Sequence, residues 1–156
     1  MISNVETYLA IAREAHAEMK RLDGESRRPK QDGSPGHIVT YDPERRSLKQ
    51  AMIAIAFAGI YFEAAVYLVA LKKVTKGKAG KIDRLPYEQR LPKLGITDQS
   101  LLDGAQALRE IRKDLVHEKA VLPAELEAAT FRLAQKSADQ ALVFINQLHG
   151  VLSGAP

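Results

Sequence analysis

The feature that most constrains this chain is a run of 21 residues, 51–71, that is apolar on every helical face except at Glu63. Such a helix lies either at the centre of a bundle or in a membrane, and its length of about 30 Å would suit either. Seven of the 21 residues are alanine, and a charge near the middle of a span costs about 2.5–3.5 kcal/mol. Basic residues flank both ends, so no orientation bias appears. We therefore expect the central helix of a soluble bundle, running from residues 42–43 to about 74.

Composition narrows the class of protein. The chain has 156 residues, 46% of them apolar, which predicts one domain with a core of its own. It has no cysteine, which excludes disulfide scaffolds, thiolate metal sites and cysteine nucleophiles. The four histidines include no pair at helical ligand spacing, so no metal or cofactor is expected. The N-terminal stretch lacks the basic and apolar regions of a secretion signal, which favours a cytoplasmic protein.

Three further helices are expected around the apolar one. The first carries an apolar stripe from residue 5 to about Leu22, with Ser3 as its cap and Gly24 as its stop. The next begins at Thr97 or Asp98 and runs to about residue 118, and the last begins at Pro123 and continues almost to the end. We predict an all-α, up-down four-helix bundle over residues 1–156, with room for a short extra helix.

Two connectors join these helices. Residues 23–43 are rich in Gly, Pro, Ser and charge, which predicts a loop that is either functional or disordered. Residues 72–96 form a basic connector. Its segment 72–93 has eight Lys or Arg against two acidic residues, a net charge of +6 in a chain of net +4. This segment is interpreted either as a solvated loop or as a phosphate-contacting patch in which Lys76, Lys78 and Lys81 bind RNA. Tyr87 beside it could stack on a base.

Most catalytic motifs are missing from the sequence, and the segment 109–118 is the one that remains. In it Arg112 and His117 are separated by four residues. A guanidinium binds phosphate through a bidentate fork, and an imidazole takes and gives protons near neutral pH. The pair could cleave an RNA phosphodiester through its own 2′-hydroxyl, without a metal. The alternative is that His117 is an ordinary polar residue near a helix C-terminus.

The sequence from Arg112 to His117 resembles the R-x4-6-H signature of the HEPN superfamily, the higher eukaryotes and prokaryotes nucleotide-binding domains. Residues 100–111 are similar to the helix that leads into that motif, and the alanine-rich helix is similar to the family's earlier core helix. The resemblance covers residues 48–150. It implies a helical bundle that dimerises with two motifs facing one cleft, and metal-independent endoribonuclease activity in catalytic members.

In that reading Arg112 binds the scissile phosphate and His117 is the general acid or base. Asp114 is assigned to the catalytic set and Lys113 to RNA binding. Lys113 stands where many catalytic members carry asparagine, and Lys119 where antitoxin-paired toxins often carry tyrosine. The resemblance leaves two expectations open: a metal-independent ribonuclease, or a non-catalytic interaction module with an antitoxin or regulatory partner. An unrelated structural bundle is the third reading.

Glu63 is the remaining candidate. A carboxylate on an otherwise apolar helix must be paired, hydrogen-bonded or neutral. Glu63 forms a structural ion pair with a nearby arginine, lies exposed on a less buried face of the helix, or belongs to the catalytic set, where it orients Arg112 or His117. We interpret Gly59 and the alanines before it as a site of close helix packing.

Overall fold

The computed structural model describes residues 4–40, 42, 44–117 and 128–154, and this part of the chain is mostly helical. A short two-stranded antiparallel sheet follows the first helix. The elements are α1 (Val5–Glu25), β1 (Arg27–Pro29), β2 (His37–Val39), α2 (Arg46–Lys73), α3 (Lys76–Asp83), α4 (Tyr87–Arg90), the 3-10 helix η1 (Pro92–Leu94), α5 (Gln99–His117) and α6 (Ala128–Ser153).

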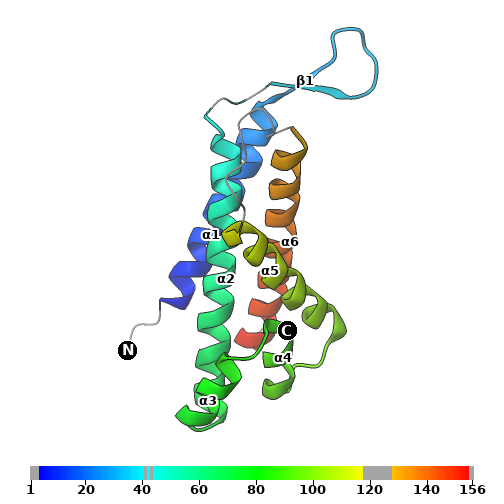
Figure 1. Cartoon of the computed structure of the whole chain (residues 1–156). Coiled ribbons are helices and arrows are strands. Elements are labelled where there is room, and N and C mark those ends of the chain that lie inside the picture. Colours follow the sequence, from blue (N-terminus) through cyan, green and yellow to red (C-terminus); the bar gives the residue numbers. More distant parts are fainter. Residues whose placement is uncertain (1–3, 41, 43, 118–127, 155–156) are drawn as a thin grey trace.

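The apolar helix α2 is the central element. It packs against α1, α6, α5 and α3, and α1, α2 and α6 lie side by side along most of their length (Figure 1). The chain runs up α1, down α2, obliquely up α5 and down α6 (Figure 1). The all-α expectation is therefore confirmed, and the long central helix is the one that the sequence pattern predicted.

The core joins α2 to its neighbours through aromatic side chains. The ring of Phe62 stacks on Tyr87 with centroids 4.3 Å apart and lies 5.9 Å from Phe144 of α6. A methyl group at Gly104 of α5 would overlap the Phe144 ring. The absence of a side chain at that position therefore lets α5 approach α6 closely.

Helix α2 also passes the length and composition test for a membrane span. An 18-residue window has a mean hydropathy of 2.0, and 44% of that window is buried inside the protein. One such helix is weak evidence for a span, because the core helix of a soluble protein passes the same test.

Two helix ends differ from the prediction. Helix α1 continues through Gly24 to Glu25, where the backbone N–H of Ser26 bonds the carbonyl of Leu22. Helix α2 begins at Arg46, one turn later than expected, because Arg45 has a left-handed backbone conformation, with φ 53° and ψ 36°, that a right-handed helix does not include. In this turn Asp42 accepts hydrogen bonds from the backbone N–H groups of residues 44 and 46. Asp98 caps α5 as predicted, accepting from the backbone N–H of Leu101 at 3.1 Å. The predicted positions at Ser3, Pro43, Pro123 and residue 118 lie outside the described residues.

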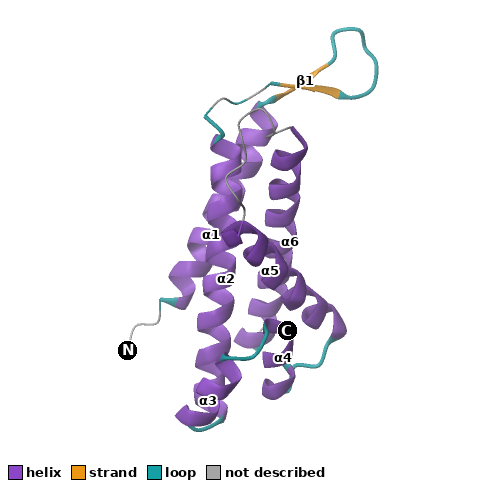
Figure 2. Ribbon diagram, viewed as in Figure 1, coloured by secondary structure: helices purple, strands orange, loops and turns teal. Residues whose placement is uncertain are grey.

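Neither connector is the plain loop that the sequence suggested. Residues 23–43 contain the hairpin β1–β2, which projects beyond the helices (Figure 2) and whose strand residues are all exposed. The basic connector 72–96 folds into α3, α4 and η1. The interpretation of it as a solvated loop is wrong, because Ala79, Ile82, Leu91 and Leu94 are buried. Its lysines stay on the outside of that structure.

Candidate functional site

The motif arginine lies in a cluster of three side chains from three helices. Nη1 of Arg112 on α5 donates a hydrogen bond to Oε1 of Glu63 on α2 at 2.8 Å. The hydroxyl of Tyr87 on α4 donates to the same Oε1 atom at 2.6 Å. Nη1 of Arg112 also donates to the Tyr87 hydroxyl oxygen. We call these three residues the Arg112 cluster.

Gly59 makes room for this arrangement. It lies one helical turn before Glu63, so the two residues share a face of α2. A Cβ atom at position 59 would overlap Cδ of Arg112 and lie 2.8 Å from its Cζ. The arginine therefore crosses the backbone of α2 at a glycine and ends at a carboxylate. The predicted close packing at Gly59 is observed, and the packed group is the motif side chain.

Tyr87 is held in place from several sides. Its side chain is buried, with the residue only 5% exposed, and its ring stacks on Phe62. The guanidinium of Arg90 lies 5.0 Å from the ring centroid and is itself fixed by hydrogen bonds to the Leu85 carbonyl and to Asp83. Because Tyr87 cannot move freely, its hydroxyl is a fixed partner for the Glu63–Arg112 pair.

A second ion pair ties α4 to α5 beside the cluster. Arg109 donates to the two carboxylate oxygens of Glu88 at 3.1 and 3.2 Å. Two arginines three residues apart on α5 thus reach two neighbouring residues of α4. Helix α4 therefore contacts the face of α5 that carries Arg112 and holds it in place.

The electrostatics keep Tyr87 protonated and Arg112 charged near neutral pH. Burial, with the Glu63 hydrogen bond, raises the pKa of Tyr87 above its usual value, so the phenol stays a donor. Burial by itself would lower the pKa of Arg112, but the hydrogen bond to Glu63 and the neighbouring Tyr87 raise it overall. Arg112 is therefore always charged.

Part of the cluster faces solvent. The Glu63 side chain is 42% exposed and that of Arg112 is 26% exposed. Within the described part of the chain, neither Oε2 of Glu63 nor Nη2 of Arg112 has a hydrogen-bond partner. The cluster thus presents one acceptor and one donor edge to an incoming molecule.

The other motif residues are placed differently. Lys113 and Asp114 are exposed on α5, and the Lys113 ammonium lies 4.0 Å from Glu110. His117 is the last residue of α5, and its side chain is outside what the structure describes. Five residues advance a helix by about 7.5 Å and 140°, so a regular helix does not direct Arg112 and His117 to the same side.

Of the predicted RNA-binding lysines, the three on α3 lie away from the Arg112 cluster. Lys76, Lys78 and Lys81 are exposed on α3, which continues beyond the far end of α2 (Figure 1). Glu63 lies ten residues before Lys73, the end of α2, which corresponds to about 15 Å of helix. The lysines thus form a separate basic surface at one end of the molecule.

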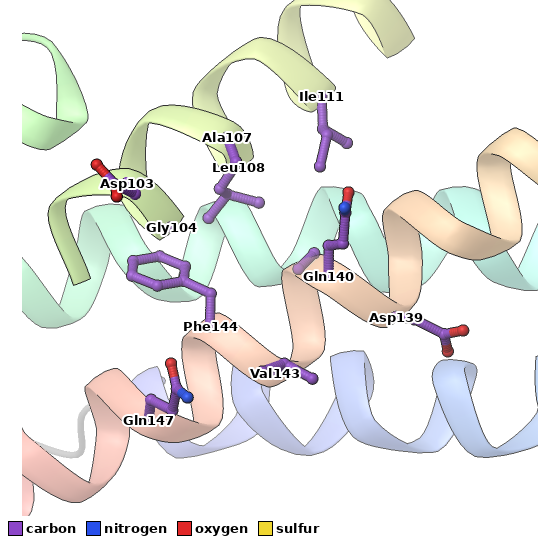
Figure 3. Close-up of a pocket in the computed structure, with 11 residues that line it drawn as sticks. Asp103, Gly104, Ala107, Leu108, Ile111, Asp139, Gln140, Val143, Phe144 and Gln147 are labelled. Carbon is purple, nitrogen blue, oxygen red and sulfur yellow. The ribbon is translucent and has the colours of Figure 1, made fainter. Parts of the chain in front are cut away.

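A groove of about 430 Å³ lies between α5 and α6, on another side of α5 from the cluster. Figure 3 shows Phe144 pointing toward Gly104, with Leu108 and Ile111 from α5 above it and Val143 beside it on α6. Asp103 and Asp139 lie among its lining residues, and Asp139 is already paired with His16 at 2.7 Å and with Lys20 at 3.2 Å. The groove is mainly apolar and contains no residue of the Arg112 cluster.

Among the residues that the structure describes, no group of three His, Asp or Glu side chains is placed to hold a metal ion. Sequence reasoning gave Tyr87 only a base-stacking role and missed its hydrogen bonds to Glu63 and Arg112. The available signal was the isolated carboxylate in an apolar helix, which requires partners but does not name them.

Comparison with known proteins adds no relative: no family model matches the chain, and neither a curated protein nor a solved structure matches it.

Proposed function

We propose that this protein is a HEPN-like, four-helix-bundle RNA-acting protein of the cytoplasm, and that it cleaves RNA as a metal-independent endoribonuclease. The observation that supports the proposal is the Arg112 cluster: the motif arginine is half-buried, permanently charged and held by Glu63 at 2.8 Å. A positioned guanidinium with a donor edge toward solvent is a fitting partner for a phosphodiester.

The proposed reaction needs no group beyond the chain and the RNA. The ribose 2′-hydroxyl attacks the adjacent phosphorus, and the bond from phosphorus to the 5′-oxygen of the next nucleotide breaks. The products are a 2′,3′-cyclic phosphate and a 5′-hydroxyl. Arg112 stabilises the charge that grows on the phosphate oxygens, and His117 takes the proton from the 2′-hydroxyl or gives one to the leaving oxygen.

A homodimer is part of this proposal. Arg112 and His117 diverge around a regular helix, so a second protomer would supply the complementary group. Helix α2, which carries Glu63, also exposes the adjacent apolar residues Met52 and Ile53 near its start, and burial of these side chains against a second protomer would favour association.

The same ion pair supports a second candidate. Glu63 neutralises the charge of Arg112, so the ion pair could simply hold α5 against α2. The protein would then be a non-catalytic interaction or regulatory module that pairs with an antitoxin or another partner protein. In that case the protein binds its partner or RNA and cleaves nothing.

Incubation with a mixed-sequence RNA in EDTA separates the two candidates. We expect wild-type protein to cleave the RNA, the His117→Ala variant to be inactive, and the His37→Ala variant, altered on the exposed hairpin, to match the wild type. RNA binding without cleavage by folded wild-type protein would favour the module. The absence of both binding and cleavage would contradict the RNA-acting proposal and leave a module that binds a partner protein, or the structural bundle.

A further inference from the structure

Glu63 presents an unusual environment to the phosphate that Arg112 is proposed to hold. One carboxylate oxygen, Oε1, already accepts hydrogen bonds from Arg112 at 2.8 Å and from Tyr87 at 2.6 Å. The second oxygen, Oε2, has no partner among the described residues, and the side chain is 42% exposed. The carboxylate that holds Arg112 therefore keeps one oxygen without a partner, and neither that oxygen nor the unpaired Nη2 of Arg112 is buried.

A carboxylate in that position opposes anions. It repels a phosphate at close range and cancels much of the attraction of Arg112. A phosphate ligand gains from this oxygen only if it also carries a hydrogen-bond donor next to its charged group. Tyr87 cannot supply that donor to Oε2, because its hydroxyl is already committed to Oε1 and its ring is fixed by Phe62.

In a nucleic acid the ribose 2′-hydroxyl is a donor adjacent to the 3′-phosphate, and it is what distinguishes RNA from DNA at a given site. We infer that Glu63 is a specificity-determining residue. Its Oε2 accepts a hydrogen bond from the 2′-hydroxyl while Arg112 holds the neighbouring phosphate, so that the Arg112 cluster selects ribose over deoxyribose. This inference rests on the proposed function, in which Arg112 is the phosphate-binding group.

The packing around Glu63 suits this role. Its Oε1 atom is fixed by two donors, which orients Oε2 before any ligand arrives. Preorganised polar groups discriminate more strongly than mobile ones, because a ligand that lacks the matching group leaves them unpaired. Deoxyribose would leave Oε2 facing the phosphate with no donor between them.

The test compares binding of two 12-residue oligouridylates, one of RNA and one with 2′-fluoro sugars, which keep the ribose shape but carry no 2′ donor. The protein is the full chain with His117→Ala, so that no RNA is consumed, and Kd is measured by fluorescence anisotropy in EDTA. We expect this protein to bind RNA about tenfold more tightly than 2′-fluoro RNA, the value of one hydrogen bond to a charged group.

Adding the Glu63→Gln substitution should reduce the ratio of the two Kd values to about two or less. The amide nitrogen that then stands in place of Oε2 is a hydrogen-bond donor without charge, so it cannot accept from the 2′-hydroxyl. Glu88→Gln is the matched control: it removes the same charge from the neighbouring pair with Arg109 and should leave the tenfold ratio in place. Circular dichroism and Tm confirm that each variant is folded.

The outcomes separate this inference from the proposed function. A protein that binds neither oligonucleotide overturns the proposed function and the inference with it. A protein that binds RNA and keeps its tenfold preference in the Glu63→Gln variant overturns the inference alone. If the Glu88→Gln control also loses the preference for RNA over 2′-fluoro RNA, the preference depends on the total charge of the protein, and the role of Glu63 is overturned.

Discussion

The side chain of Arg112 lies against the backbone of Gly59, so closely that a single methyl group at position 59 would overlap the arginine Cδ atom. Gly59 and Glu63 are one turn apart on α2, so the arginine side chain passes over Gly59 and its guanidinium reaches the Glu63 carboxylate. The position of the motif arginine is thus determined by a residue on another helix that carries no side chain.

The first prediction concerns this contact. Gly59→Ala should displace Arg112 from Glu63 and lower the free energy of unfolding by about 1–3 kcal/mol, the usual cost of overpacking, and it should weaken RNA binding. Gly24→Ala is the control, since it adds the same methyl group in a helix with nothing within 4 Å. The control should be neutral or slightly stabilising. Urea denaturation measures both, and equal effects of the two variants would contradict the packing argument.

The second prediction concerns the basic surface on α3. Replacing Lys76, Lys78 and Lys81 with glutamine should flatten the salt dependence of RNA binding by about 2 in log–log slope, because each phosphate contact on a single strand contributes about 0.7. Lys136→Gln, an exposed lysine on α6, should leave the slope unchanged. Titrations between low and moderate salt provide the measurement. An unchanged slope in the triple variant would show that α3 does not contact RNA.

The third prediction concerns association. We expect a homodimer at micromolar concentration by sedimentation, formed through α2, where Ile53 is 38% exposed. Ile53→Lys should weaken the dimer by placing a charge in an apolar contact. Val143→Lys makes the same change on α6, beside the groove with α5, and should not. A monomer at all concentrations would remove the composite site, and dissociation by Val143→Lys alone would move the interface to α6.

The fourth prediction concerns alkaline stability. Burial raises the pKa of Tyr61 to about 12, and its hydroxyl pairs with Nδ1 of His149 at 3.0 Å. The ordinary value in the unfolded chain is about 10. The folded state therefore holds this proton more tightly, so its stabilisation is complete below about pH 10 and lost between about pH 10 and 12. The total is about 3 kcal/mol.

The test of that prediction compares wild type with Tyr61→Phe. The variant should lose about 1 kcal/mol at pH 8 through the missing hydrogen bond and should lose less stability than the wild type from pH 8 to pH 11. Urea denaturation at the two pH values measures both effects. Parallel losses in the two proteins would show that Tyr61 does not contribute to the pH dependence.

The central helix and its neighbours could be predicted because their patterns are long and regular. Apolar residues recur at helical spacing in each of the long helices, and burial of Leu9, Met19, Leu108 and Leu148 follows that period. Glu63 could be identified as a candidate because the neighbouring residues of its own helix are apolar and cannot pair with a carboxylate. Its contact with Arg112 is among the arrangements expected from the sequence, and the geometry fits both the orienting and the structural interpretation.

The remaining features have no such pattern. The hairpin strands are exposed on both faces, so they lack the alternation that marks a half-buried strand. In α3 the lysines dominate the composition, while only Ala79 and Ile82 are buried. Gly24 does not end α1, because it does not adopt the left-handed conformation by which a glycine ends a helix, and Ser26 still bonds to the Leu22 carbonyl. The hydrogen bond from Tyr87 joins residues 24 positions apart, and only the folded chain brings them together.

The last prediction concerns chemistry, and it distinguishes two ways of losing activity. Arg112 is proposed to stabilise charge in the transition state, so its replacement should lower turnover at every pH. His117 is proposed to transfer a proton, so its loss should cost about 10²–10⁴ in rate and remove one limb of the pH–rate profile. Arg112→Lys keeps the charge but loses the planar fork that binds a phosphate through two nitrogens, and it should restore little activity. Single-turnover cleavage of an RNA oligonucleotide in EDTA across pH 5–9, roughly the range over which a histidine titrates, measures all three variants. If folded His117→Ala cleaves at the wild-type rate with an unchanged pH profile, the motif does not carry the chemistry.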